Sequence, residues 1–300
     1  MLHLARYSAG GGGGAGGRQP GLQHPAPPRL PPEGARVNRV QSPVITNDRI
    51  LPGVCRAGAR NVQGTWLIWL QAPDIARDAR PGQYVMVGCG PEAVLPRPFS
   101  LHDVSGGRIA LLYNELENGR GTGWLSRRRP GDSVALFGPL GHGFSVRPDA
   151  RRLLLVAGGI GVAPLRFLAD AAIEQGKEVI LLMGAASAGQ LCPSGLLPSG
   201  AGLLRITEDG SEGERGLVTQ YLPGLAGKYD QVMACGPLAM YRAMARLGGP
   251  AQVSLETRMG CGLGTCYGCT VNTRQGLRQV CRDGPVFELG DIIWDKLIPG

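Results

Sequence analysis

Hydrophobic and polar positions follow two different patterns along this chain, and the change between them comes near Arg151. From about residue 37 to residue 146, short runs rich in β-branched and aromatic residues are separated by turns that contain glycine or proline. This spacing predicts the strands of a small antiparallel β-barrel of Greek-key type. The runs are TWLIWLQA (65–72), GQYVMVGC (82–89), RIALLYNEL (108–116) and SVALFGP (133–139).

Beyond Arg151, continuous apolar runs alternate with segments of helical period. Residues 151–176 predict a buried strand, a glycine turn and a helix, and residues 229–248 predict the same succession. Further buried strands are predicted at KEVILLMGA (177–185) and GLLRITEDG (202–210). Apolar strands that alternate with helices predict parallel βαβ units in a doubly wound sheet.

These patterns predict a multidomain protein. A barrel domain is expected at 35–148, an α/β nucleotide domain at 149–250, and a small cysteine-rich segment at 251–300. Residues 1–34 contain a run of five glycines and the stretch HPAPPRLPPEG. Such sequence cannot bury a core, so a disordered arm is predicted there.

Charge and composition exclude several classes of protein. The net charge is +8, but residues 1–60 hold eight arginines against two acidic residues, which leaves +2 for the other 240 residues. A nucleic-acid-binding function is therefore not expected. No apolar run approaches the ~20 residues of a membrane span, and the N-terminus lacks a signal-peptide pattern. We expect a cytoplasmic protein, in which the eight cysteines are thiols or metal ligands.

Four of the cysteines form a cluster near the C-terminus, with the spacing Cys261-x4-Cys266-x2-Cys269-x11-Cys281. C-x4-C-x2-C followed by a fourth cysteine is the plant-type spacing of [2Fe–2S] ligands. The glycines between them permit close approach of backbone amides to a negatively charged cluster. A structural zinc site that mediates a protein contact remains the alternative, although zinc more often uses two short knuckles. Cys55, Cys89 and Cys192 are expected to be small buried side chains.

The barrel carries a second candidate site. Residues Arg97 to Ser100 read Arg-Pro-Phe-Ser, and the turn Gly119-x-Gly121-Thr122 leads into a helix-like segment some twenty residues later. Free amides at a helix start beside an arginine are suited to bind a diphosphate. Tyr113 offers an aromatic face for stacking, and Ser100 a hydroxyl for a ring nitrogen.

The α/β half carries a third candidate site in two loops. The first is the glycine loop at 158–161, which with Pro164 opens a helix and suits a pyrophosphate. The second is the loop Cys235-Gly236-Pro237, which ends a later strand, where open α/β sheets bind ligands. Cys235 is interpreted either as a nicotinamide contact or as a packed thiol. After the second strand, MGAASAGQL (183–191) lacks a basic residue for a 2′-phosphate, which favours NADH over NADPH.

In this order, the three sites resemble the ferredoxin–NADP reductase superfamily. The tail SLETRMGCGLGTCYGCTVNTRQGLRQVCRDGPVFELGDIIW (254–294) is similar to the iron–sulfur segment of electron-transfer subunits of class B dihydroorotate dehydrogenase. The resemblance covers roughly residues 37–295. It implies FAD contacts at Arg97, Pro98, Phe99, Ser100, Leu112, Tyr113, Asn114, Gly121 and Thr122. It implies NAD(H) contacts at Gly158, Gly159, Gly161, Cys235, Gly236 and Pro237, and [2Fe–2S] ligands at Cys261, Cys266, Cys269 and Cys281.

The resemblance also implies a function. Electrons would move between NAD(H), FAD and the cluster, to or from the FMN of a separate dihydroorotate dehydrogenase catalytic subunit in pyrimidine (UMP) biosynthesis, in a heterotetramer of two plus two subunits. Another flavin and iron–sulfur complex, an NADH-dependent ferredoxin–NADP transhydrogenase or a sulfhydrogenase, remains an alternative. No acid–base or nucleophilic constellation is found, so no catalytic side chain is expected in this chain. Two positions depart from the family: Asn114 stands where an arginine is common, and Tyr267 where an aliphatic residue is expected.

Overall fold

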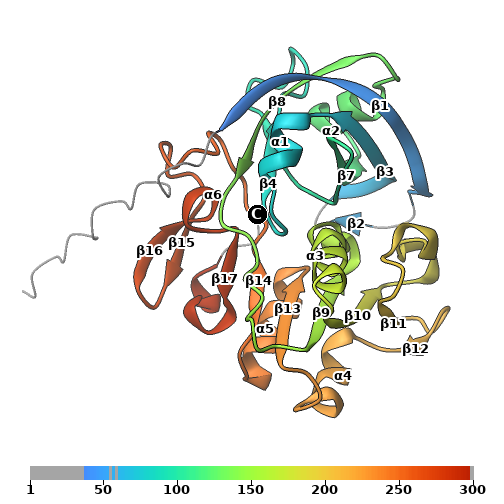
Figure 1. Ribbon diagram of the computed structural model, residues 1–300, viewed down its shortest axis with the longest axis vertical. Helices are drawn as coiled ribbons and strands as arrows, with labels where there is room; N and C mark the ends of the chain where they lie inside the picture. Colours follow the sequence, from blue (N-terminus) through green and yellow to red (C-terminus); the bar gives the residue numbers. More distant parts are fainter. Residues whose placement is uncertain (1–36, 54–55, 58–59, 298–300) are drawn as a thin grey trace, which may run out of the picture. The chain divides into compact units, whose positions relative to one another are not determined.

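The first half of the chain folds into a curled antiparallel sheet. The computed structural model describes residues 37–53, 56–57 and 60–297; the predicted arm at 1–34 and Cys55 lie outside these residues. The sheet has eight strands in the order β5-β4-β8-β1-β3-β7-β6, with β2 paired to β3 (Figure 1). The strands are β1 (Asn38–Pro52), β2 (Arg56–Ala57), β3 (Arg60–Gln71), β4 (Tyr84–Val87), β5 (Arg97–Ser100), β6 (Asp103–Ser105), β7 (Arg108–Leu116) and β8 (Ser133–Leu140).

Side-chain alternation decides which face of the curled sheet is its interior. On β7, Ile109, Leu111 and Tyr113 point into the core of the curled sheet, whereas Ala110 and Leu112 pack against the second half of the chain. Both faces of this strand are therefore buried. Two short helices, α1 (Pro73–Asp78) and α2 (Arg120–Ser126), accompany the sheet. The four predicted strands are present, whereas β1, the longest, was not predicted because polar and apolar residues are mixed along it and only Ser42 and Val44 are buried.

The second half is a seven-stranded sheet in the order β12-β11-β10-β9-β13-β14-β17. All its pairs are parallel except β14 with β17. The strand order reverses between β9 and β13, so the loops after these two strands meet at a switch point. The strands are β9 (Arg152–Gly158), β10 (Glu178–Ala185), β11 (Gly202–Thr207), β12 (Glu214–Arg215), β13 (Gln231–Cys235), β14 (Gln252–Ser254) and β17 (Val286–Glu288).

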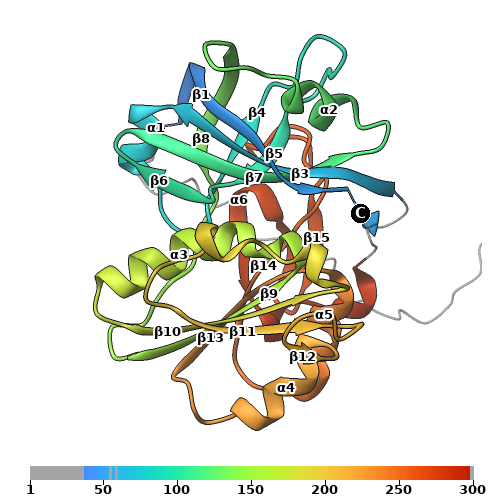
Figure 2. The same cartoon turned by 90° about the vertical axis from the view of Figure 1, so that its right-hand side faces the viewer.

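Helices lie on both faces of this second sheet, as the predicted βαβ units require. Figure 2 shows α3 on the face toward the curled sheet, and α4 and α5 on the opposite face. The α-helices are α3 (Val162–Glu174), α4 (Val218–Leu225) and α5 (Leu238–Leu247); single 3₁₀ turns are η1 (Gly159–Gly161), η2 (Ala188–Gln190), η3 (Ser194–Leu196), η4 (Leu289–Asp291) and η5 (Trp294–Lys296). Within the described part of the chain, no helix is long and apolar enough to cross a membrane.

The cysteine-rich segment is less separate than its sequence suggests. It contains a hairpin of β15 (Thr270–Thr273) and β16 (Gly276–Gln279), followed by the short helix α6 (Val280–Asp283). Strand β17 then returns to the second sheet and pairs with β14. The second sheet therefore continues beyond residue 250, which the absence of helical period in the tail did not reveal.

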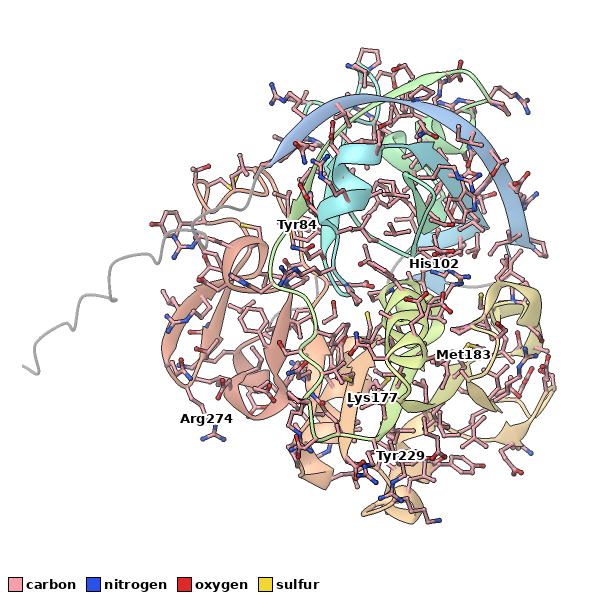
Figure 3. All side chains as sticks on the ribbon, viewed as in Figure 1. Tyr84, His102, Lys177, Met183, Tyr229 and Arg274 are labelled. Carbon is pink, nitrogen blue, oxygen red and sulfur yellow. The ribbon has the colours of Figure 1, made fainter. Side chains whose placement is uncertain are left out.

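The curled sheet and α3 are joined by an apolar contact with a polar centre. Leu67 and Leu112 of the curled sheet share a core with Ala163 and Leu165 of α3. Within this contact the buried ring of His102, labelled in Figure 3, donates from Nδ1 to the carbonyl of Ala163 at 2.9 Å. Burial, and to a smaller extent the nearby Arg166 guanidinium, lowers the pKa of His102 to about 4.

We predict that His102 makes the folded chain less stable as the pH falls. Because its pKa is lowered to about 4 in the folded state and is ordinarily near 6.5 when unfolded, the unfolded chain binds one more proton between these values. The free energy of unfolding should fall by up to about 1.4 kcal/mol per pH unit over this window from this residue alone.

Denaturant titrations at several pH values between 7 and 4 check this. The variant His102→Gln should have a shallower pH dependence than the unaltered chain, whereas His142→Gln, which changes an exposed residue, should keep it. Equal slopes for His102→Gln and the unaltered chain would contradict the assignment.

Candidate functional site

Three of the four clustered cysteines, Cys261, Cys266 and Cys269, lie in one loop, and Cys281 lies in α6. Backbone amides point at three of the four sulfur atoms. The amides of Leu263 and Thr265 donate to Cys261 Sγ at 3.4 and 3.3 Å. The amide of Gly264 donates to Cys281 Sγ at 3.2 Å, and the amide of Cys281 donates to Cys269 Sγ at 3.4 Å. Amides that converge on sulfur stabilise negative charge there, as the thiolates and sulfides of an iron–sulfur cluster require.

Glycine is needed in this loop for two separate reasons. Gly262 and Gly264 have φ values of +72° and +80°, a left-handed conformation that favours glycine. A Cβ on Gly262 would also lie 2.6 Å from Met86 Cγ. Tyr267 adopts φ +56° without being glycine, and its side chain is 68% exposed.

The thiols of the loop respond to this environment in different directions. Burial opposes ionisation of Cys261, but hydrogen bonds from the Thr265 side chain and from backbone amides outweigh it and lower the pKa to about 6. The hydrogen bond with Cys281 lowers the pKa of Cys269 to about 6 and raises that of Cys281. Cys269 and Cys281 are buried, whereas Cys266 is exposed. The donor set fits an anionic sulfur-ligated group with one side toward solvent.

Among the described residues, no group of three or more His, Cys, Asp or Glu side chains is arranged to hold a single metal ion. A structural zinc ion needs four ligands around one point, whereas a two-iron cluster spreads its four cysteines over two metal atoms.

Three of the predicted flavin residues, Arg97, Gly121 and Thr122, lie at the first turn of α2. Arg97 begins β5, and a Cβ on Gly121 would lie 3.3 Å from Arg97 Cγ. The arginine stem thus packs against the first turn of α2. Thr122 Oγ1 accepts a hydrogen bond from the Leu116 amide at 3.1 Å, which fixes the turn that enters the helix. An arginine beside free helix amides is the arrangement that a diphosphate requires.

Tyr113 lies in a different position from the one expected. Its ring is 3% exposed and packs edge-on against Phe99, with ring centroids 5.6 Å apart. Its hydroxyl donates to Asn47 Oδ1 at 3.2 Å. The expected stacking face is therefore not presented at the surface, because the alternation of β7 turns this residue into the core. Its neighbour Asn114 is half-buried and accepts from Thr65 Oγ1 at 2.8 Å.

The two nucleotide loops contact each other at the switch point of the second sheet. A Cβ on Gly161 would lie 2.0 Å from the carbonyl oxygen of Cys235, and one on Gly158 would lie 2.6 Å from Pro237 Cδ. These glycines therefore permit the two loops to touch. Gly159, with φ +55°, has open space around its missing side chain.

Cys235 is fully buried in the sheet core, at 1% exposure. Burial, and secondarily the charge of Glu256, raises the pKa of its thiol well above the ordinary value. These observations favour the packed thiol over the nicotinamide contact. The Gly236 amide is held by the Tyr241 hydroxyl at 2.9 Å, which in turn donates to the Ser254 carbonyl at 2.6 Å.

Three residues near these sites were missed in the sequence. Glu256 follows β14 at the same sheet edge as the two nucleotide loops. Asn47 caps α2 by donating from Nδ2 to the Leu125 carbonyl at 2.9 Å, and Tyr84 contacts the cysteine loop. Only Glu256 carried a signal, since it is a charged residue directly after an apolar strand. The other two act over long sequence separations.

Comparisons with known proteins agree on one family. The profile of a family described as the iron–sulfur cluster binding domain of dihydroorotate dehydrogenase B matches residues 256–293. The NAD(+)-linked dihydroorotate dehydrogenase B electron transfer subunit of Desulforamulus reducens is 37% identical over 77% of this chain and 93% of its own length. The protein of the same name from Caldanaerobacter subterraneus subsp. tengcongensis is 36% identical, over 71% of this chain and 87% of its own.

A solved structure shares the fold. The structure of an NADH-dependent reduced ferredoxin–NADP oxidoreductase, studied for flavin-based electron bifurcation, superposes with a TM-score of 0.74. It covers 86% of this chain and 91% of the other at 26% identity. The predicted fold class, a curled antiparallel sheet, a largely parallel α/β sheet and a C-terminal iron–sulfur segment, is confirmed.

We predict that Gly161→Ala destabilises the chain and weakens its binding of NADH. The added methyl group would overlap the Cys235 carbonyl and force the two loops apart, at a cost of about 1–3 kcal/mol. Denaturant unfolding and a fluorescence titration with NADH measure both effects.

Gly195→Ala is the matched control, because nothing lies within 4 Å of the added atom. It should leave stability unchanged or raise it by up to about 1 kcal/mol. If both substitutions behave alike, the loop contact does not require glycine.

Proposed function

The chain belongs to the family of dihydroorotate dehydrogenase B electron transfer subunits, and from this premise we propose how its residues carry out that role. It is the NAD(H)-linked oxidoreductase subunit of a complex, with FAD, a [2Fe–2S] cluster and NAD(H) as its cofactors. Its part in pyrimidine biosynthesis follows from the dehydrogenase it serves. The observation that carries the assignment of the cluster is the set of amides directed at Cys261, Cys269 and Cys281.

When bound, FAD exchanges a hydride with NAD(H) and single electrons with the cluster, which links a two-electron carrier to a one-electron carrier. The chain supplies position and electrostatics for this chemistry. Arg97 and the first turn of α2 hold the flavin diphosphate, and Ser100 and Asn114 lie on the strands that face it. The Gly158–Gly161 loop and the Gly236–Pro237 loop hold the nicotinamide nucleotide at the switch point of the sheet. Cys261, Cys266, Cys269 and Cys281 ligate the cluster.

The partner of this chain is a dihydroorotate dehydrogenase catalytic subunit. We propose that this partner carries FMN and that two copies of each subunit form a heterotetramer. A cytoplasmic location is part of the proposal, and the seven described cysteines, none of which lies in a disulfide, are consistent with it.

The surface beside the cluster is suited to receive the partner. Four large apolar side chains are exposed there: Val94 at 92%, Leu95 at 51%, Leu263 at 52% and Tyr267 at 68%. The two loops that carry them are adjacent, since Leu95 Cδ1 lies 3.9 Å from the position of a Cβ on Gly260. We define Val94, Leu95, Leu263 and Tyr267 as the cluster face. Apolar side chains at such exposure mark an interaction surface. The exposed Cys266 lies beside it, since its Sγ is 3.3 Å from the same position on Gly260.

We predict that serine at any one of the four ligand positions removes the cluster and leaves the flavin in place. After anaerobic purification, each variant should lose iron, acid-labile sulfide and cluster absorbance, retain FAD, and still reduce an artificial dye with NADH. It should no longer support NAD⁺ reduction by dihydroorotate when mixed with the catalytic subunit.

Cys192→Ser replaces a buried cysteine outside the loop and should keep iron and coupled activity. A purified protein that contains zinc and no flavin would overturn the proposed function. Coupling to ferredoxin but not to a dihydroorotate dehydrogenase would support the transhydrogenase alternative instead.

We predict that Leu263→Asp weakens association with the catalytic subunit about tenfold or more, which corresponds to about 1.4 kcal/mol. Titration calorimetry or analytical ultracentrifugation measures the affinity, while iron and FAD content verify that the subunit is intact. Leu247→Asp alters an equally exposed leucine at the end of α5 and should bind normally. Normal binding by Leu263→Asp would place the contact elsewhere.

A further inference from the structure

Tyr84 connects the flavin-binding sheet to the cysteine loop through one buried hydroxyl. We propose that Tyr84 is a positioning residue: it holds the cluster loop at a fixed place against strand β4 and so sets how the cluster sits relative to the flavin. This inference rests on the proposed function, since it assigns a role to a residue beside the cluster. Figure 3 labels Tyr84 where β4 borders the C-terminal segment.

The hydroxyl contacts both ends of the four-cysteine set. Its oxygen lies 2.9 Å from the carbonyl oxygen of Cys281, the last ligand, and 3.2 Å from that of Gly262, which follows the first ligand. A tyrosine hydroxyl has one proton to donate, so the two carbonyls share it. Tyr84 is 2% exposed, and Gly262 and Cys281, which carry the two carbonyls, are buried as well.

The strand that carries Tyr84 is buried on both faces. Val85 and Val87 point into the core of the curled sheet. Tyr84 and Met86 point the other way, into a core that also contains Cys269 and Cys281. One face of this four-residue strand thus belongs to the core of the flavin-binding sheet. Tyr84 and Met86 on its other face form the surface on which the cysteine loop rests, which we call the seat.

The loop is shaped to fit this seat. Gly262 lies directly over Met86, and its left-handed φ turns the loop so that the carbonyl reaches the Tyr84 hydroxyl. A side chain on Gly262 would collide with Met86. The contact is therefore specific in both backbone conformation and hydrogen bonding, beyond the burial of an aromatic ring.

The same residue is one strand away from the proposed flavin site. Tyr84 pairs with Ser100 across the β4–β5 ladder. Two connections therefore link the flavin strand to a cluster ligand. Ser100 pairs with Tyr84 across the ladder, and the Tyr84 hydroxyl donates to the Cys281 carbonyl. Removal of the hydroxyl leaves the packing of the ring intact but breaks the second connection.

The test is Tyr84→Phe in the full-length, cofactor-loaded subunit. We expect FAD content and the rate of flavin bleaching by NADH to stay the same. Iron release to a chelator should become about fivefold faster, the factor expected for loss of one net hydrogen bond. The electron paramagnetic resonance signal of the reduced cluster should shift or broaden, and cluster bleaching after mixing with NADH should slow.

Tyr221→Phe is the matched control, because it deletes a hydroxyl that donates to the Arg215 carbonyl at 2.9 Å, outside the cysteine loop. It should leave the cluster signal and iron release unchanged. Gly262→Ala tests the seat independently and should accelerate iron release more than Tyr84→Phe does. Normal iron release and an unaltered cluster signal in Tyr84→Phe would overturn the inference while the proposed function stands. A subunit that contains no iron–sulfur cluster before any substitution would overturn the proposed function itself.

Discussion

Other parts of the chain bury the outward-facing side chains of the curled sheet, and the functional arrangement depends on these contacts. Leu67 and Leu112 pack against α3, which follows the glycine loop, whereas Tyr84 and Met86 pack against the cysteine loop. Two separate apolar contacts of the sheet thus set the places of the nucleotide site and of the cluster site. His102 fixes the geometry of the contact with α3, and Tyr84 that of the contact with the cysteine loop. Each makes a buried hydrogen bond that tolerates little displacement.

Sequence pattern predicted those features whose cause is local. The four apolar strands of the curled sheet, the βαβ succession and the cysteine spacing each depend on residues close together in the chain. Strand β1 was not predicted, because buried and exposed residues alternate only weakly along it. Strand β17 was not predicted either, because its partner β14 lies more than thirty residues upstream. The orientation of Tyr113 toward the core was not predicted, because strand alternation is known only once the register is known.

The ligand set of the cluster was predicted residue by residue, but its surroundings were not. The spacing of the cysteines identified the four ligands. The residues that support the loop, Tyr84 and Met86, lie far away in the sequence: Tyr84 is 197 residues from Cys281. No periodicity signals a contact of that kind. The glycine loops were predicted in part. Their glycines indicated that another group comes close to the backbone. That this group is the Cys235 carbonyl follows only from the strand order of the sheet.

The great sequence separation between Tyr84 and the cysteine loop also imposes an order on biogenesis. A ribosome releases the strands of the curled sheet long before it releases Cys261 to Cys281, and domains fold as units, N-terminal ones first. The surface that receives the cysteine loop is therefore complete when the loop emerges. The cysteine loop, which belongs to the last seventh of the polypeptide, thus folds against a surface formed by the first third.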